Sequence, residues 1–275
     1  MTWSKTYSGA EPVRLNKLLA REGVCSRREA EALIARGQVR IDGEKVAEPG
    51  QKISAGQTVS LNEAATADLG AQVTAVLHKP VGYVSAQPEG AQIPAARLVK
   101  RANLIGKASS IPAGDASLAP LGRLDQDSRG LLLLSEDGVL AKAVIGPESR
   151  LDKEYLVRVR GDITEAKLKK LRHGLELDGR KLRPAKVTAM KGGILRFILI
   201  EGRKRQIRRM CQLVDLHVLD LLRIRIGPLS IGSLPEGKWR ALTPDERKRL
   251  ISAARPPERP KAKGKSFDRR RGGRP

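Results

Sequence analysis

Residues 120–134 constrain the fold of this chain more than any other stretch. The segment opens with turn-forming residues and has a charged side chain at every second position from 123 to 129. It closes on four consecutive leucines at 131–134. The charged residues are Arg123, Asp125, Asp127 and Arg129. Four leucines in a row leave no polar face, so the strand that they form has to be buried. We therefore predict a charged loop at the edge of a buried strand, a position typical of functional groups.

The net charge of the chain indicates which kind of molecule it binds. Its 275 residues carry 53 Lys and Arg against 30 Asp and Glu, which gives a formal charge of +23. Such an excess of one sign favours a polyanion as partner, and nucleic acid is the first candidate. No stretch approaches 18 consecutive apolar residues, and the N-terminus lacks the apolar core of a secretory signal. The composition therefore predicts a cytoplasmic protein with no membrane partner.

Cysteine and histidine are rare in this chain. The two cysteines are Cys25 and Cys211, and the three histidines lie far apart at positions 78, 173 and 217. These numbers and spacings fit neither a disulfide framework nor a zinc site, so a metal-free protein is expected.

The N-terminal part of the chain predicts a small domain. We expect residues 1–12 to be a disordered leader. From 13 to 62, apolar residues at helical spacing followed by short alternating runs predict two helices and a small sheet. Ser26 and Glu29 have the spacing of a capping box at the start of the second helix.

The segment 14–44 resembles the S4 RNA-binding domain. It contains Arg-Leu-Asn-Lys-Leu-Leu-Ala, Cys-Ser-Arg-Arg-Glu-Ala-Glu and Gly-Gln-Val-Arg-Ile-Asp-Gly-Glu in that order. The resemblance implies that basic side chains near the first helical turns bind RNA phosphates, which positions RNA without reading its sequence. These side chains are Arg14, Lys17, Arg27 and Arg28. They could instead be a solvated face with no ligand.

The rest of the chain predicts a second domain and a tail. An Ala-rich segment at 63–71 is expected to be a linker. Residues 72–253 interleave strands and helices and contain hairpin turns, which predicts an α+β domain with a largely antiparallel sheet. Residues 254–275 carry nine basic and two acidic side chains, a charge of +7, and are predicted to be a disordered basic tail that adds affinity for RNA.

Four motifs of the second domain resemble, in order and spacing, the pseudouridine synthases of the RsuA and RluB/RluE/RluF type. The motifs are Lys79-Pro80-Val81-Gly82, Gly122-Arg123-Leu124-Asp125, Lys153-Glu154-Tyr155 and the arginine-rich segment 202–209, which is most similar to the RluF branch. The resemblance covers about 14–250. It implies an α+β protein in which a small S4 domain precedes a catalytic domain whose mixed, largely antiparallel sheet is flanked by helices.

The resemblance also implies an activity: isomerisation of a specific uridine in ribosomal RNA, in particular that of the large subunit, without a cofactor. Within the motifs, Asp125 matches the nucleophile, Tyr155 the aromatic residue that stacks on the target base, and Arg208 the basic residue that pairs with the aspartate. Further contacts with the RNA or the target base are expected from Arg123, Gln126, Lys79, Arg205 and Leu222. No segment predicts an obligate interface, so a monomer is expected.

The chemistry of uridine isomerisation is consistent with these residue types. The N1–C1′ bond breaks, the uracil turns, and C5 is joined to C1′, with no need for a redox step or a metal. A carboxylate can act at C1′ or remove a ribose proton, and both routes stay open. The uridine must leave its stack, and an aromatic face replaces the lost stacking.

The residues by themselves leave other interpretations open. Asp125 could be a turn residue paired with Arg123, or it could hold a magnesium ion together with Asp127. Tyr155 could be a core residue, since it shares a strand face with Val157. At the level of the whole protein, the alternatives are a non-catalytic RNA-binding assembly factor and an enzyme that acts on transfer RNA.

Overall fold

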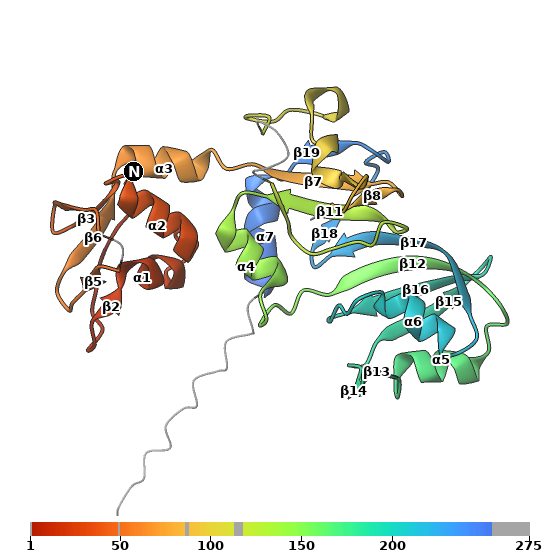
Figure 1. Cartoon of the computed structure of the whole chain (residues 1–275). Helices are drawn as coiled ribbons and strands as arrows, with labels where there is room; N and C mark the ends of the chain where they lie inside the picture. The colour runs from red at the N-terminus through yellow and green to blue at the C-terminus, as the bar shows by residue number, and fades with distance from the viewer. Residues whose placement is uncertain (1, 49, 86–87, 113–117, 255–275) are drawn as a thin grey trace, which may run out of the picture.

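The computed structural model describes residues 2–48, 50–85, 88–112 and 118–254 (Figure 1). The chain forms an N-terminal domain and a larger second domain. The predicted basic tail at 254–275 lies outside the described residues except for Ala254, which ends the last helix.

The N-terminal domain packs helices against a four-stranded sheet of order β1-β6-β3-β4. Its elements are β1 (Ser4–Thr6), β2 (Val13–Arg14), α1 (Leu15–Arg21), α2 (Arg27–Ala35), β3 (Val39–Ile41), β4 (Glu44–Val46), β5 (Lys52–Ile53), β6 (Thr58–Leu61) and α3 (Glu63–Gly70). The capping box is confirmed: the Ser26 side chain accepts from the Glu29 amide and the Glu29 carboxylate accepts from the Ser26 amide. The predicted pair of helices and small sheet is therefore present.

Two predictions at the edges of this domain are wrong. The expected disordered leader contributes β1, which pairs with β6, and Tyr7, which is 6% exposed in the domain core. The expected linker is helix α3, which begins at the N-cap Asn62 and buries Ala65 in the same core. In both segments a few apolar side chains find space on the core, so the backbone is ordered where composition suggested a loose chain.

The second domain is built on a nine-stranded sheet whose main path is β15-β16-β12-β17-β11-β7-β19. Neighbouring strands pair antiparallel except β11 and β17, which are parallel, so the predicted mixed, largely antiparallel sheet is confirmed. Its strands are β7 (Thr74–Lys79), β8 (Tyr83–Val84), β9 (Ile93–Pro94), β10 (Ala119–Pro120), β11 (Arg129–Ser135), β12 (Lys153–Arg160), β13 (Glu176–Leu177), β14 (Arg180–Lys181), β15 (Lys186–Met190), β16 (Ile194–Leu199), β17 (His217–Ile226), β18 (Leu229–Ser230) and β19 (Trp239–Ala241), of which β8, β9, β13 and β14 lie outside this sheet.

Helices cover this sheet. They are α4 (Gly138–Ile145), α5 (Glu165–Arg172), α6 (Gln206–Gln212) and α7 (Pro244–Ala254), with short 3-10 turns at Ala95–Leu98 and Arg101–Asn103. Helices α4 and α7 contact each other on the side of the sheet that faces the N-terminal domain (Figure 1).

The leucine run is the buried strand that the sequence predicts. All four leucines of β11 are fully buried. Leu131 and Leu133 pack into a cluster with α4 and α7, while Leu132 and Leu134 pack into a cluster on the other face with Trp239. Both faces of the strand are therefore covered, and the charged loop before it is fixed to the centre of the domain.

Candidate active site

A cavity of about 770 Å³ opens beside the charged loop. Its walls come from the loop before β11, the start of β12, the segment 199–208 and the middle of β17. The volume is that of a typical small-ligand site. Three of the four motifs noted in the sequence therefore meet at one place.

Asp125 lies in this cavity on a loop that is held in place. The residue is half-buried, and its carboxylate makes no hydrogen bond or ion pair to any residue that the structure describes. The loop is pinned on both sides: the buried Ser85 hydroxyl donates to the Leu124 carbonyl (2.8 Å) and accepts from the Leu124 amide (2.8 Å), and the Gly82 amide donates to the Gln126 carbonyl (2.9 Å). Asp125 is thus a positioned carboxylate with free lone pairs, and it is not the turn residue paired with Arg123.

Two buried cations lie in one row of the sheet next to this loop. Gly130, at the start of β11, pairs with Lys79 on β7 and with Arg223 on β17. Lys79 is 0% exposed and Arg223 is 3% exposed. A Cβ atom on Gly130 would lie 2.3 Å from the Arg223 carbonyl oxygen, and the φ of Gly130 is +112°. Only glycine allows this close approach of the two strands.

Lys79 is fully buried, which contradicts its predicted role as a direct contact with RNA. Its ammonium donates to the Pro80 carbonyl (2.7 Å) and the Tyr83 carbonyl (2.8 Å), which fixes the bend that follows β7. Burial lowers the pKa of Lys79 from 10.5 to about 8, although the nearby charges of Asp127 and Asp125 oppose that shift. Lys79 is therefore a buried support of the loop.

Two nitrogen atoms of the Arg223 guanidinium donate hydrogen bonds to the backbone, and the third has no partner among the described residues. Its Nε donates to the Leu131 carbonyl (2.7 Å) and its Nη1 to the Arg123 carbonyl (3.3 Å). Its Nη2 is buried without a hydrogen-bond partner among the described residues, although the residue lines the cavity. The cavity therefore holds a fixed positive charge in addition to Lys153, which is half-buried and whose pKa is lowered by burial and by Arg223.

Asp127 binds the two arginines that the sequence assigns to the active site. Arg205 forms a bidentate pair with its carboxylate (3.1 and 2.8 Å), and the Arg208 Nε lies 3.3 Å from the same group. Arg208 also donates to the Asp127 carbonyl (2.7 Å). Burial raises the pKa of Asp127, but the hydrogen bond from Arg205 and the charges of both arginines outweigh it and hold the pKa below its ordinary value.

This arrangement corrects two expectations. Arg208 pairs with Asp127, and the structure shows no bond from it to Asp125. Asp127 is occupied by two guanidinium groups, which disfavours the interpretation of Asp125 and Asp127 as ligands of a magnesium ion. The arginine-rich segment is thereby attached to the loop that carries Asp125.

Tyr155 serves both the core and the cavity. It lies near the start of β12, opposite Arg223 on β17 and Phe197 on β16. The ring is half-buried, packs against the core clusters on either side and lines the cavity. Tyr155 is therefore both a core contact and part of the cavity wall.

The other predicted contacts fall in different places. Arg123 and Arg205 are exposed and line the cavity. Gln126 is exposed outside it, where its amide donates to the Gly82 carbonyl (3.2 Å). Leu222 points to the opposite face of β17, and Leu221 lines the cavity in its place, because alternate residues of a strand face opposite sides. The expectation for Leu222 is therefore wrong by one position.

The predicted RNA surface of the N-terminal domain is exposed. Arg14 precedes α1, Lys17 lies within it, and Arg27 and Arg28 form the first turn of α2. None of the four makes an ion pair with a residue in the described part of the chain. Their charges are consequently free for an anionic partner.

Sequence reasoning missed Ser85, Gly130, Leu221 and Arg223. Gly130 had a usable signal, since a glycine directly before a buried strand indicates a close approach of backbones. The roles of Arg223 and Leu221 depend on which face of β17 is turned to the cavity, and that is set by pairing with distant strands.

Among the described residues, no helix is both long enough and apolar enough to cross a membrane.

Comparison with known proteins finds the same two domains in this chain. Residues 73–213 match the family described as RNA pseudouridylate synthase, and residues 13–59 match the S4 domain. The chain is 35% identical to the dual-specificity RNA pseudouridine synthase RluF of Salmonella typhi, with 92% of this chain and 84% of that protein covered. It is also 35% identical to ribosomal large subunit pseudouridine synthase B of Bacillus subtilis, with 88% and 96% covered.

A solved structure described as a pseudouridylate synthase superposes with a TM-score of 0.59 at 26% identity, covering 87% of this chain and all of that one. The family match covers more than half of the chain and includes the loop of Asp125, Tyr155 and the segment of Arg208. The S4 domain and the fold of the catalytic domain thus have counterparts in proteins of one class. The chain belongs to the RNA pseudouridine synthases of the RsuA/RluB/RluF type.

Proposed function

We propose that this enzyme isomerises a specific uridine of large-subunit ribosomal RNA and that Asp125 is the carboxylate that acts on the ribose. The observation that carries the proposal is the Asp125 carboxylate itself, which is half-buried on a pinned loop, has no partner among the described residues, and faces a cavity bordered by Tyr155 and several cations. The choice of RNA is supported by the relative named ribosomal large subunit pseudouridine synthase B.

The reaction is an isomerisation in which all atoms of the uridine are retained except the proton on C5, which is lost to solvent. The N1–C1′ bond breaks, the uracil turns within the cavity, and C5 forms the new bond to C1′. The proton on C5 leaves, and N1 gains a proton. Asp125 either attacks C1′ as the uracil departs or removes a ribose proton, and the free lone pairs of its carboxylate serve both routes.

The cations of the cavity stabilise the charge that develops. When the N1–C1′ bond breaks, negative charge builds on the uracil, and fixed donors in a partly dehydrated site stabilise such charge strongly. Arg223 and Lys153 are buried or half-buried at the cavity wall, so their orientation is set before the RNA binds. They are the groups that we expect to face the detached base.

The uridine reaches the cavity by leaving its stack. Removing a base from a stack costs a few kcal/mol, and an aromatic side chain that stacks on the base offsets part of that cost. Tyr155 is half-buried and lines the cavity, and Arg123 and Lys204 are exposed at its border. We therefore place the uracil on Tyr155 and the flanking phosphates along these basic side chains.

The test is a map of pseudouridines in ribosomal RNA from cells that lack this protein. Carbodiimide modification followed by primer extension should show one large-subunit site that is lost in these cells. The wild-type protein should restore the site, and Asp125→Asn should not, although the variant protein is present and folded. If every ribosomal site persists without the protein, the proposed substrate is wrong.

The same cells test transfer RNA as the second candidate substrate. Relatives of this chain are named dual-specificity RNA pseudouridine synthases, which makes a second class of RNA a candidate substrate for this cavity. A site lost from transfer RNA alone would replace ribosomal RNA as the substrate, and loss of sites from both would extend the proposal.

A further inference from the structure

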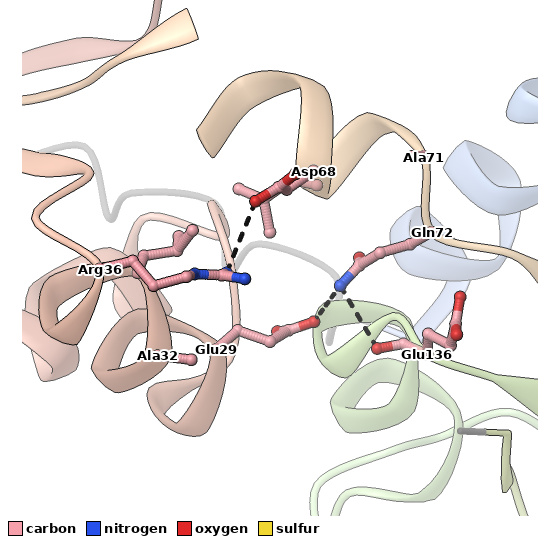
Figure 2. A pocket seen from close by; sticks show the side chains of 9 residues that line it. Glu29, Ala32, Arg36, Asp68, Ala71, Gln72 and Glu136 are labelled. Atoms are coloured by element: carbon pink, nitrogen blue, oxygen red, sulfur yellow. Dashed lines mark hydrogen bonds and ion pairs between the residues drawn. The ribbon is translucent and has the colours of Figure 1, made fainter. Parts of the chain in front are cut away.

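The S4 domain meets the catalytic domain through the carboxylate of Glu29 (Figure 2). One oxygen of this carboxylate accepts from the Ser26 amide at the start of α2 (2.5 Å). The other oxygen accepts from the Gly138 amide at the start of α4 (3.2 Å) and from the Gln72 side-chain amide (2.5 Å). One carboxylate thus serves the amino ends of two helices that belong to different domains, where helix dipoles favour a negative charge. We call Glu29, Gln72 and Gly138 the docking contact.

The segment that connects the two domains is short. Helix α3 packs on the S4 core through Ala65, and Asp68 near its end accepts from the side-chain amide of Gln38 (3.1 Å). Only residues 71–73 separate α3 from β7. Within them, Gln72 binds Glu29 and the Val73 amide donates to the Glu136 carboxylate (3.0 Å). The connection is therefore a short segment whose polar groups are already used at the domain boundary.

The two domains are in close contact at Gly138. A Cβ atom on this residue would lie 2.4 Å from the Ser26 Cβ and 2.6 Å from the nearer Glu29 carboxylate oxygen. A glycine at the first position of α4 is therefore required by the neighbouring domain, since the helix itself would be more stable with alanine there.

The boundary around the docking contact contains both polar and apolar side chains. A cavity of about 380 Å³ lies next to it between the domains, and its wall includes the charged side chains of Arg36, Asp68 and Glu136 (Figure 2). Two domains of one chain can move relative to each other unless specific bonds or a large apolar contact hold them. The hydrogen bonds of Glu29 are the specific bonds that join the start of α2 to the start of α4 across this boundary.

The docking contact lies directly beside the RNA surface of the S4 domain. Arg27 and Arg28 are exposed in the same first turn of α2 that Glu29 caps. On the other side, α4 follows β11, the strand that begins at the loop of Asp125. Fixing the amino end of α2 on the amino end of α4 therefore sets the distance from Arg27 and Arg28 to the catalytic cavity.

We propose that Glu29, Gln72 and Gly138 are positioning residues that lock the S4 domain at one distance from Asp125. The enzyme then prefers an RNA long enough to occupy the basic surface of α2 and the catalytic cavity at the same time. This inference rests on the proposed function for its activity readout, and its structural readout is independent of activity.

Two substitutions open the contact in different ways. Glu29→Gln keeps the capping box, because glutamine serves at this position of the motif, but its single oxygen cannot reach both helix ends. Gly138→Ala places a methyl group against Ser26 while making α4 intrinsically more stable. The matched control is Gly70→Ala at the end of α3, where an added Cβ has no atom within 4 Å.

The structural readout is the distance distribution between dyes attached to Lys45→Cys in the S4 domain and Lys186→Cys in the catalytic domain of the full chain. Both lysines are exposed, and the native Cys25 and Cys211 are 2% and 0% exposed and should not label. We expect one narrow distribution for the wild type and the control, and a broader or displaced one for Glu29→Gln and Gly138→Ala. Unchanged distributions in both variants would overturn the proposal.

The activity readout compares a long ribosomal fragment with a minimal hairpin that contains only the target uridine and its flanking stem. Glu29→Gln and Gly138→Ala should lower kcat/KM on the long fragment about tenfold, which corresponds to about 1.4 kcal/mol, and leave the hairpin within about twofold of wild type. The loss should appear in KM. Equal losses on both RNAs would show a merely structural defect and contradict the proposal. A wild type that is inactive on both RNAs would instead count against the proposed function.

Discussion

At the residue scale, two aspartates that are two positions apart have opposite environments. Asp127 is held by Arg205 and Arg208, whereas the carboxylate of Asp125 has no partner among the described residues. The difference follows from the pinned backbone of the loop, which turns one carboxylate toward α6 and the other into the cavity. A carboxylate that is already paired is a poor nucleophile or base, so the structure favours Asp125 for the chemistry.

Lys79 gives a prediction about stability and pH. Burial lowers its pKa to about 8 in the folded enzyme, against 10.5 for an unperturbed lysine. Between these values the unfolded chain holds a proton that the folded chain has released, so this group makes the folded state more stable as the pH rises. The free energy of unfolding of wild type minus that of Lys79→Met should therefore increase from pH 8 to pH 10, by at most about 1.4 kcal/mol per pH unit.

Chemical denaturation of both proteins at several pH values measures this difference, in which the titration of all other groups cancels. A difference that stays constant or falls between pH 8 and pH 10 would show that Lys79 keeps its charge in the folded enzyme.

At the element scale, the pairing of β11 with β17 is the part of the fold on which the site depends most. This pair is parallel, and its register sets Gly130 beside Arg223 and Arg129 beside Leu222. The same register leaves Leu221 and Arg223 on the cavity side of β17. A shift by one residue would turn both away from the cavity, so the site exists only in this register.

Gly130→Ala should disrupt this pairing. The new Cβ would lie 2.3 Å from the Arg223 carbonyl oxygen, and alanine is strained at a φ of +112°. We expect a loss of roughly 2–4 kcal/mol in the free energy of unfolding, together with loss of activity. Urea denaturation measures it, with Gly70→Ala as the control that should change stability by less than about 1 kcal/mol. Wild-type stability in Gly130→Ala would mean that the two strands can separate at no cost.

How much of this could be predicted from the sequence depends on whether a feature is local. The buried leucine strand and the capping box of Ser26 and Glu29 were predictable because each lies within one short pattern. The partner of Arg208 and the second role of Glu29, which binds an amide 109 positions later, depend on tertiary packing. The ordered leader was missed for a related reason, since β1 is stabilised by pairing with β6 on a distant segment.

At the scale of the whole molecule, charge is arranged on two surfaces. One is formed by Arg14, Lys17, Arg27 and Arg28 in the S4 domain, and the other borders the catalytic cavity. The net charge of +23 adds a non-specific attraction for RNA, of which +7 comes from residues 255–275. Affinity for RNA should therefore fall steeply with salt concentration.

Deletion of residues 255–275 tests this division of charge. The truncated enzyme should show a shallower dependence of log Kd on log salt concentration, because fewer counterions are released when it binds RNA. Its kcat at saturating RNA should stay at the wild-type value, since no residue of the cavity is removed. Fluorescence anisotropy at several salt concentrations measures the slope, and an unchanged slope would show that these residues do not contact the RNA.

The central claim, that Asp125 acts on the ribose, is tested most directly by the release of tritium from RNA that carries [5-³H]uridine. Release reports loss of the C5 proton, which occurs only when C5 has been joined to C1′. In single turnover with enzyme in excess, Asp125→Asn should bind the RNA within about threefold of wild type and release tritium at least about 1,000-fold more slowly, while Asp127→Asn remains measurably active. Release by Asp125→Asn at the wild-type rate would contradict the account.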